Sequence, residues 1–336
     1  MNTVGLQRTL PLGALAALLC LAPLVASGGT DFLRTQTIEL QSGWNAVFLE
    51  VEPRDSSPDT VFEGTPVEIA AAWLRPVSTV EYIANPESEP WNLPGWSVWF
   101  APEREDAFLS SLYAIRGQQA YLVKASEAFQ WEIEGGVRHR PIRWQAGSFN
   151  LQGFNVDPAA PPTFAEFFAG AEGRVGGRVY RLLNGEWRPV NNPTLTRLRP
   201  GEAYWIHSRG RTDYQGPVTV HGLAGGALRL SPATGETRIA IQNTGAGMTD
   251  IGLAVAGGSL PLMEVRADGF DTERHPIIES ADWAGLAPGD GAVLRLYGRS
   301  PSGVADSAGA VLKITANGVI QWIPVHNANL PNEGNP

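Results

Sequence analysis

The sequence predicts an all-β protein: two related small β-rich modules in tandem, followed by an immunoglobulin-like β-sandwich. Three observations support this prediction. The 336 residues include 38 glycines and 26 prolines, which favour many turns and short strands over long helices. The first two thirds of the chain contain an internal repeat, and the last third consists of short alternating apolar runs between turn residues.

Residues 1–27 are expected to be an export signal. Arg8 precedes an apolar run from 10 to 25, and small residues at 25–27 supply a cleavage site. The run is short for a membrane span, and a buried core helix is the alternative. Cys20, the only cysteine, follows Leu19, which argues against lipid anchoring. We therefore expect a secreted or cell-surface protein, with the periplasm as the alternative, and no membrane span after cleavage.

The internal repeat starts with the segments IELQSGWNAVFLEVEP (38–53) and IRWQAGSFNLQGFNVDP (142–158). With one inserted residue, six positions match: Gln41/Gln145, Gly43/Gly147, Trp44/Phe149, Asn45/Asn150, Val51/Val156 and Pro53/Pro158. Each copy then has aromatic residues before a glycine (61–64 and 167–170). Each closes on a glycine turn, at Gly117 or Gly201, followed by an Ala-Tyr strand. We assign residues 28–136 to the first module and 137–225 to the second.

Each module is expected to be one supersecondary unit. In the first copy a strand from Trp44 to Val51 leaves a turn at Gly43, where a positive φ is favourable. A short helix or turn follows around Phe62, and its counterpart in the second copy lies around Phe168. Strands 178–183 and 186–190 flank Asn-Gly at 184–185, a strong hairpin signal.

This pattern resembles the GWN-type repeat modules of large exported bacterial proteins, which begin with a GWNL strand and end in L.PG.AYW. The closing motif here is LRPGEAYW, residues 198–205, and the resemblance covers residues 37–208. The first copy lacks a proline before Gly117, and the second has Phe149 in place of tryptophan. The resemblance implies an exported part with a structural role and no active site.

Seven short runs predict the C-terminal sandwich, which we place at 226–327, ahead of a polar tail at 328–336. The runs are 227–230, 237–242, 251–255, 262–266, 292–297, 310–315 and 319–325. Asn317-Gly318 predicts a type I′ hairpin between the last two runs. The Asn-Thr-Gly at 243–245 and the closing Ile-Pro-Val at 323–325 resemble bacterial surface Ig-like domains.

Charge is shared unevenly along the chain. The net charge of −9 speaks against nucleic acid as the main partner. Residues 30–136 hold 6 basic and 17 acidic side chains, whereas residues 137–211 hold 11 basic and 5 acidic ones. Opposite charges suggest that the modules pair, either within the chain or head-to-tail between copies. The alternative is simple divergence of solvated surfaces.

A Pro/Gly-rich insertion at 91–100 carries the candidate glycan-binding residues, Trp91, Trp96, Trp99 and Phe100. Flat aromatic rings stack on the apolar faces of sugars. The alternative, which we favour, is that the rings fill the core of the first module. Residues three apart on an extended strand point to opposite faces, so Trp96 and Trp99 would not form one platform.

Arginines supply the second candidate site. Arg138-His139-Arg140 and the arginines at 174–199 are able to hold an anionic polymer or another copy of the chain, with a solvated basic face as the alternative that we favour. The second group comprises Arg174, Arg178, Arg181, Arg188, Arg197 and Arg199. The five histidines show no metal-binding spacing, and no nucleophile or phosphate-loop motif occurs. The sequence therefore predicts no metal, no cofactor and no catalytic residue.

We expect a non-catalytic structural or adhesive protein in a cell-surface or extracellular assembly. Its partners would be other surface proteins, further copies of the chain or a polysaccharide. The alternative is a carbohydrate-binding protein that uses the aromatic residues at 91–100. An enzyme with carboxylates converging from different modules is a third reading.

Overall fold

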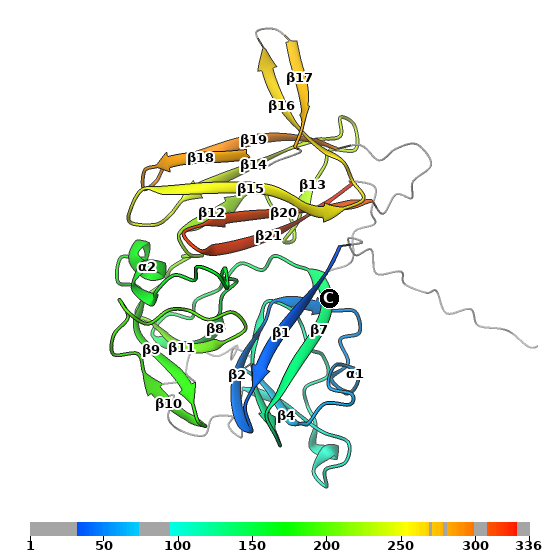
Figure 1. The fold of residues 1–336 in the computed structure, drawn as a ribbon, viewed down its shortest axis with the longest axis vertical. Helices are drawn as coiled ribbons and strands as arrows, with labels where there is room; N and C mark the ends of the chain where they lie inside the picture. Colours follow the sequence, from blue (N-terminus) through cyan, green and yellow to red (C-terminus); the bar gives the residue numbers. More distant parts are fainter. Residues whose placement is uncertain (1–31, 74–94, 269–270, 278–280, 299–307, 328–336) are drawn as a thin grey trace, which may run out of the picture.

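The computed structural model describes residues 32–73, 95–268, 271–277, 281–298 and 308–327, and it confirms the all-β fold class. Figure 1 shows the first and second modules beside each other, with the C-terminal sandwich above both and a hairpin projecting from it. The expected export signal and the polar tail lie outside the described residues.

The first module is a sandwich of two sheets. The outer sheet has the order β1 (Leu33–Leu40), β7 (Phe129–Val137), β3 (Val51–Pro53). The central sheet has the order β2 (Gly43–Leu49), β6 (Gln119–Ala125), β4 (Val67–Trp73), β5 (Trp96–Phe100). Alternate residues of β2, Val47 and Leu49, face the outer sheet and pack with Trp131 of β7. The short helix α1 (Pro58–Val61) precedes Phe62, which packs in the same core.

The second module repeats the central sheet. Its sheet has the order β8 (Ser148–Gly153), β11 (Ala203–Ser208), β9 (Val175–Leu183), β10 (Glu186–Pro189). Taken in this sheet order, the strands correspond one by one to β2, β6, β4 and β5, and all neighbours are antiparallel in both sheets. The helix α2 (Phe164–Phe168) takes the place of α1 and begins with a capping box between Thr163 and Glu166. The sequence repeat is therefore a repeated four-stranded sheet.

An asparagine staple explains why one position of the repeat motif is the same in both copies. The side-chain oxygen of Asn45 accepts a hydrogen bond from the Gln41 N–H at 2.9 Å, and its amide donates to the Gln41 carbonyl at 2.8 Å. Asn150 makes the same two bonds to Gln145, at 2.8 and 3.2 Å. The staple closes the turn that leads into β2 or β8.

A buried tyrosine makes a second shared contact. The hydroxyl of Tyr121 accepts a hydrogen bond from the backbone N–H of Arg116 at 2.7 Å. Tyr204 accepts the equivalent bond from Arg199 at 2.9 Å. In each copy the donor lies five residues before the tyrosine, so the ring fixes the chain that enters the closing strand.

In the turn before the closing strand, the structural equivalence of the two copies is shifted by one residue from the sequence alignment of Gly117 with Gly201. The position that corresponds to Gly201, with φ of 72°, is Gln118, with φ of 56°. Gly117 therefore does not take the left-handed conformation that the alignment with Gly201 predicts. Its role is close approach, since a Cβ there would lie 2.6 Å from the carbonyl carbon of Val51.

The two modules pack face to face through what we call the intermodule core. Phe48 and Trp96 of the central sheet meet Phe149 and Trp205 of the second module, and the Trp96 and Trp205 rings lie edge to face with centroids 6.2 Å apart. The two modules contact each other through equivalent faces of their equivalent strands, as two subunits do in the isologous interface of a symmetric dimer. The central sheet is therefore buried on both faces.

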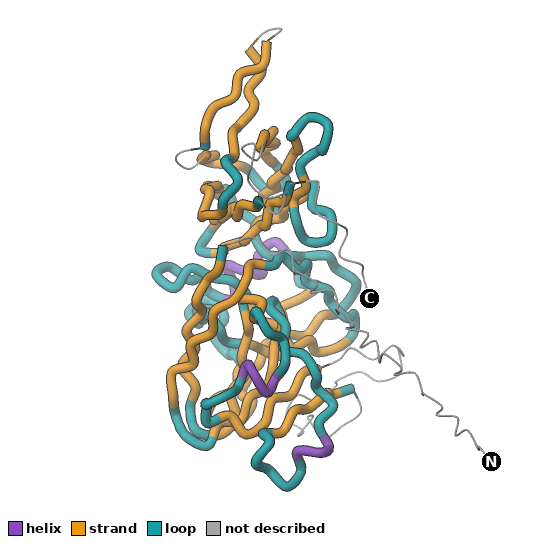
Figure 2. Tube along the Cα trace, turned by 90° about the vertical axis from the view of Figure 1, so that its right-hand side faces the viewer, coloured by secondary structure: helices purple, strands orange, loops and turns teal. Residues whose placement is uncertain are grey.

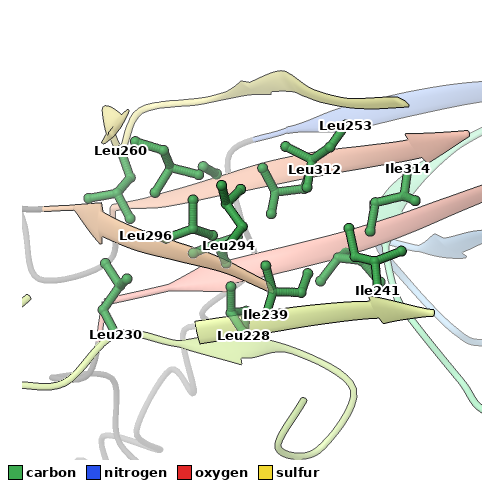
Figure 3. Packing of buried hydrophobic residues seen from close by; sticks show 14 of the residues in the cluster. Leu228, Leu230, Ile239, Ile241, Leu253, Leu260, Leu294, Leu296, Leu312 and Ile314 are labelled. Carbon is green, nitrogen blue, oxygen red and sulfur yellow. The ribbon is translucent and has the colours of Figure 1, made fainter. Parts of the chain in front are cut away.

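The C-terminal sandwich consists of two five-stranded sheets. One has the order β12 (Val218–His221), β14 (Glu236–Asn243), β19 (Gly291–Gly298), β16 (Leu262–Asp268), β17 (Asp271–Pro276). The other has the order β13 (Leu228–Arg229), β21 (Val319–His326), β20 (Gly309–Ala316), β15 (Thr249–Gly258), β18 (Ala281–Leu286). Figure 3 shows leucine and isoleucine side chains from both sheets meeting between them.

All seven predicted runs contribute strands to this sandwich, and β12, β17 and β18 are additional. β12 pairs with β14, so the sandwich begins before residue 226 and the predicted boundary there is wrong. The predicted Asn-Gly turns are present, with positive φ at Asn184, Gly185, Asn317 and Gly318. Figure 2 shows that the β16–β17 hairpin extends beyond the rest of the sandwich.

The sandwich docks on the second module through backbone hydrogen bonds. The Asp157 N–H donates to the Gly318 carbonyl at 2.8 Å, and the Ile320 N–H donates to the Asn155 carbonyl at 3.0 Å. Gly170 lies just after α2 and directly against the sandwich. A Cβ on Gly170 would lie 1.9 Å from the Thr244 carbonyl oxygen. A side chain at Gly170 would therefore push the sandwich away.

Asn150→Ala should lower the free energy of unfolding by about 1–3 kcal/mol, because the part-buried Gln145 N–H and the carbonyls bonded to the buried Asn150 amide lose their partner. Urea unfolding of the purified chain measures this loss. Asn191→Ala, at an exposed position, is the control. An equal effect of both substitutions would contradict the staple.

Trp205→Ala should cost about 3–5 kcal/mol, because its fully buried ring fills the intermodule core. Trp187, which is half-buried at the margin of the same core, supplies a matched substitution with a smaller expected loss. Thermal and urea unfolding compare the two variants. A Trp205→Ala chain as stable as Trp187→Ala would show that this core does not hold the modules.

Candidate binding cleft

Strand β5 buries three of the four aromatic candidates. Trp96 and Phe100 are each 9% exposed and belong to the intermodule core, and Trp99 is 5% exposed and faces the outer sheet. The opposite directions of Trp96 and Trp99 agree with the strand geometry predicted above. These three rings therefore fill cores and do not form the exposed sugar platform; Trp91 lies outside the described residues.

The six arginines between 174 and 199 do not form one face. The Arg181 side chain is 12% exposed and donates two hydrogen bonds to the Glu202 carboxylate, at 3.0 and 2.9 Å. Arg178, three residues earlier on β9, lies on the other side of the sheet, with its guanidinium 5.1 Å from the Phe149 ring centroid. Arg174, Arg188 and Arg199 are exposed, and each lies beside a carboxylate. The Arg197 guanidinium donates to the Pro161 carbonyl.

A cleft of about 440 Å³ opens where the first module, the second module and the C-terminal sandwich meet. We call it the junction cleft. Its lining comes from four segments that are distant in sequence: 118–120, 138–143, 150–155 and 319–322, together with a few single residues. In the sequence, only the Arg138-His139-Arg140 cluster pointed to this region.

A reciprocal pair of amides forms part of the wall. The Gln118 amide donates to the Asn155 side-chain oxygen at 3.2 Å, and the Asn155 amide donates back at 2.9 Å. Gln118 also donates to the Glu50 carbonyl at 2.7 Å. Since the Asn155 carbonyl accepts the Ile320 N–H, Asn155 connects both modules to the sandwich.

The segment 138–143 crosses the cleft and is fixed at both ends. The Ile142 N–H donates to the Gln215 side-chain oxygen at 2.6 Å, and the Gln215 amide donates to the Ile142 carbonyl at 3.0 Å. At the other end the Arg138 guanidinium lies 3.5 Å from the Glu52 carboxylate. The arginines of this segment are therefore held on an anchored backbone.

The junction cleft is cationic in a protein of net charge −9. Arg138, Arg140 and Arg143 line it, and no aspartate or glutamate occurs among the described lining residues. Within the described part of the chain, no hydrogen bond or ion pair involves the side chain of Arg140 or Arg143. Burial lowers the pKa of His139 to about 4, so at neutral pH the positive charge comes from the arginines.

Aromatic and amide side chains complete the lining. Trp73 and Trp322 are half-buried in the walls, and Gln119 and Gln152 also line the cleft. The Arg34 guanidinium lies 4.1 Å from the Trp322 ring centroid, which fixes this ring between the first module and the sandwich. The cleft therefore combines cationic, amide and aromatic groups.

Sequence reasoning did not identify a second surface, which we call the apolar tip. Phe108, Leu109 and Tyr113 are 83%, 59% and 79% exposed. They lie on and just after a short 3₁₀ turn, η2 (Ala107–Leu109), at the end of the molecule opposite the β16–β17 hairpin (Figure 1). Exposed large apolar groups close together are typical of interaction sites.

The described residues contain no group of three or more His, Cys, Asp or Glu side chains placed to hold a metal ion. Within the same ranges, no helix has the length and apolar character to cross a membrane. These findings concern only the part of the chain that the structure describes.

No protein-family model matches this chain, and no curated protein matches it in sequence. Among solved structures, a PapD-like domain of human CEP192 is similar to 35% of this chain and 87% of its own length, with 13% identity and a TM-score of 0.22. A chaperone–tip adhesin complex of Acinetobacter baumannii Csu pili matches 30% of this chain and 51% of its own, with 15% identity and a TM-score of 0.17. A DUF4785 family protein of Legionella pneumophila matches 87% and 90%, with 11% identity and a TM-score of 0.18. TM-scores this low assign no function.

Lowering the pH from 7 to 4.5 should destabilise the protein through His139. The unfolded histidine takes up a proton near its ordinary pKa of about 6.5, whereas the folded one does so only near about 4. The stability contributed by the lowered pKa is therefore present above pH 6.5 and is lost as the pH falls towards 4. His139→Gln should show a smaller drop in melting temperature between pH 7 and 4.5.

Thermal unfolding at several pH values measures this difference. The matched control is His221→Gln, at an exposed position on β12. An unchanged drop in the His139→Gln protein would show that burial of this imidazole does not govern the acid response.

Proposed function

We propose that this chain is an exported, non-catalytic structural or adhesive component of a cell-surface or extracellular assembly. The observation that carries the proposal is the apolar tip, where three large side chains are left in water at one end of the molecule. Burial of such groups in a partner is favourable by about 1.5–3 kcal/mol for each side chain fully removed from water. The export signal expected at residues 1–27 supports the part of the proposal that places the protein outside the cytoplasm.

The charge around the apolar tip indicates the kind of partner. Glu103, Glu105 and Asp106 adjoin it, with Arg104 as the only basic residue in that run. The Arg104 guanidinium donates two hydrogen bonds to Asp106, which lower the pKa of that carboxyl. Acidic residues beside an apolar surface favour a partner with a basic surface and disfavour anionic membranes.

The second module of another copy has such a surface. Residues 137–211 carry 11 basic and 5 acidic side chains. Arg174, Arg188 and Arg199 are exposed in it, each beside a carboxylate of the same module, whereas the Arg181 side chain is only 12% exposed and is held by Glu202. We therefore propose head-to-tail association, in which the apolar tip of one copy docks on the basic second module of the next.

Phe108→Ser should abolish concentration-dependent association, because it removes the most exposed ring of the apolar tip. Light scattering of the purified chain at rising concentration measures the mass, and high salt should dissociate the wild-type oligomers. Met248→Ser, which changes another largely exposed apolar residue, on the sandwich, should associate like the wild type. A wild-type chain that stays monomeric at low salt and high concentration would overturn head-to-tail assembly.

A further inference from the structure

The junction cleft has the size of a small-molecule site. Its volume of about 440 Å³ lies within the ~300–1,000 Å³ typical of ligand pockets. Both modules and the sandwich contribute walls, and two hydrogen bonds hold these walls in place: the backbone bond from Ile320 to Asn155 and the bond from the Ile142 N–H to the Gln215 side chain. A ligand here would meet groups that are positioned before it binds.

Charge selects an anionic ligand. Arg140 and Arg143 have no ion pair within the described residues, and no carboxylate is among the described lining residues. An arginine fork binds a carboxylate through two parallel hydrogen bonds, which a single ammonium group cannot match. Glu52 forms an ion pair with Arg138 and also acts electrostatically on Arg140, but one carboxylate does not balance three arginines, so positive charge remains for a ligand.

The other lining groups suit hydroxyls and an apolar ring face. Gln119 and Gln152 present side-chain amides, which both donate and accept hydrogen bonds as a hydroxyl does; the Gln152 amide uses one N–H on the Gly153 carbonyl at 2.8 Å and keeps its other N–H and its oxygen for a ligand. Trp73 supplies an aromatic surface that is only half-buried. Sugars combine hydroxyl groups with an apolar face, and their acidic forms add a carboxylate.

We propose that the junction cleft binds an acidic sugar, a saccharide unit that carries a carboxylate, as uronic acids do. Arg140 and Arg143 hold the carboxylate, Gln119 and Gln152 bond to ring hydroxyls, and Trp73 contacts the apolar face of the ring. This site goes beyond the proposed assembly function and uses none of the residues of the apolar tip. It also differs from the aromatic platform expected at 91–100.

Titration calorimetry of the purified chain with trigalacturonate tests the proposal, with trigalactose as the neutral sugar and citrate as the carboxylate without a sugar ring. The wild type should bind trigalacturonate at least tenfold more tightly than either comparison compound. Arg140→Gln and Arg143→Gln should each weaken binding at least tenfold. Arg140→Lys, which keeps the charge but loses the fork, should weaken it as well.

Arg238→Gln is the matched control, because Arg238 is exposed on β14 of the sandwich, away from the lining segments. It should bind trigalacturonate like the wild type. Melting temperatures check that the variants fold, which is expected because Arg140 and Arg143 are exposed.

Three results would overturn the proposal. Undetectable binding of trigalacturonate by the wild type would exclude an acidic sugar site. Equal binding of citrate would assign the cleft to small carboxylates without a sugar requirement. An equal loss of trigalacturonate affinity in the Arg238→Gln protein would show that the ligand is attracted by the general positive charge of the surface and not by the cleft. None of these results depends on whether the chain self-associates, since calorimetry is run on the monomeric Phe108→Ser background as well.

Discussion

Burial of the central sheet on both faces is the constraint on which the rest of this structure depends. A sheet covered on both sides needs strands that are apolar at almost every position, as β2 and β6 are from Ala46 to Leu49 and from Ala120 to Val123. Small residues make room for large ones, since Ala71 and Ala120 lie in the core that also holds Trp96 and Trp205. The outer sheet and the second module are thereby fixed relative to each other.

The repeat and the charge asymmetry have separate consequences. Equivalent faces of the two copies meet in an apolar core, so association of the modules within the chain does not depend on their opposite net charges. Among the described residues one ion pair, Arg138–Glu52, joins them. Most of the charge therefore remains on exposed surfaces, where it acts over a longer range on other molecules. This division is consistent with a chain that folds through apolar contacts and keeps its charge available to steer the association proposed above.

Local signals in the sequence identified much of the fold, because turns and alternation are local properties. The Asn-Gly pairs at 184–185 and 317–318 determined hairpins, and the repeated asparagines marked equivalent turns. Sheet order and the shared core were not predictable in this way, since they depend on contacts between distant strands. The same holds for the junction cleft. The sequence identified its Arg138-His139-Arg140 segment as a basic cluster, but Gln119, Gln152 and Trp322 reach the cleft only because the two modules and the sandwich dock together.

Because the walls of the junction cleft come from different modules, ligand binding there is thermodynamically linked to the docking of the modules and the sandwich. The Gln118–Asn155 amide pair and the Ile320–Asn155 backbone bond hold the walls of the junction cleft together, so a ligand that contacts all three walls binds only when they are assembled. Such a ligand stabilises the assembled form by RT ln(1 + [L]/Kd), about 2.7 kcal/mol at a hundredfold excess over Kd. Occupation of the cleft would therefore make the sandwich and the two modules a stiffer unit. In the surface role proposed above, stiffness between the apolar tip and the projecting hairpin would determine how contact at one end of the molecule reaches the other.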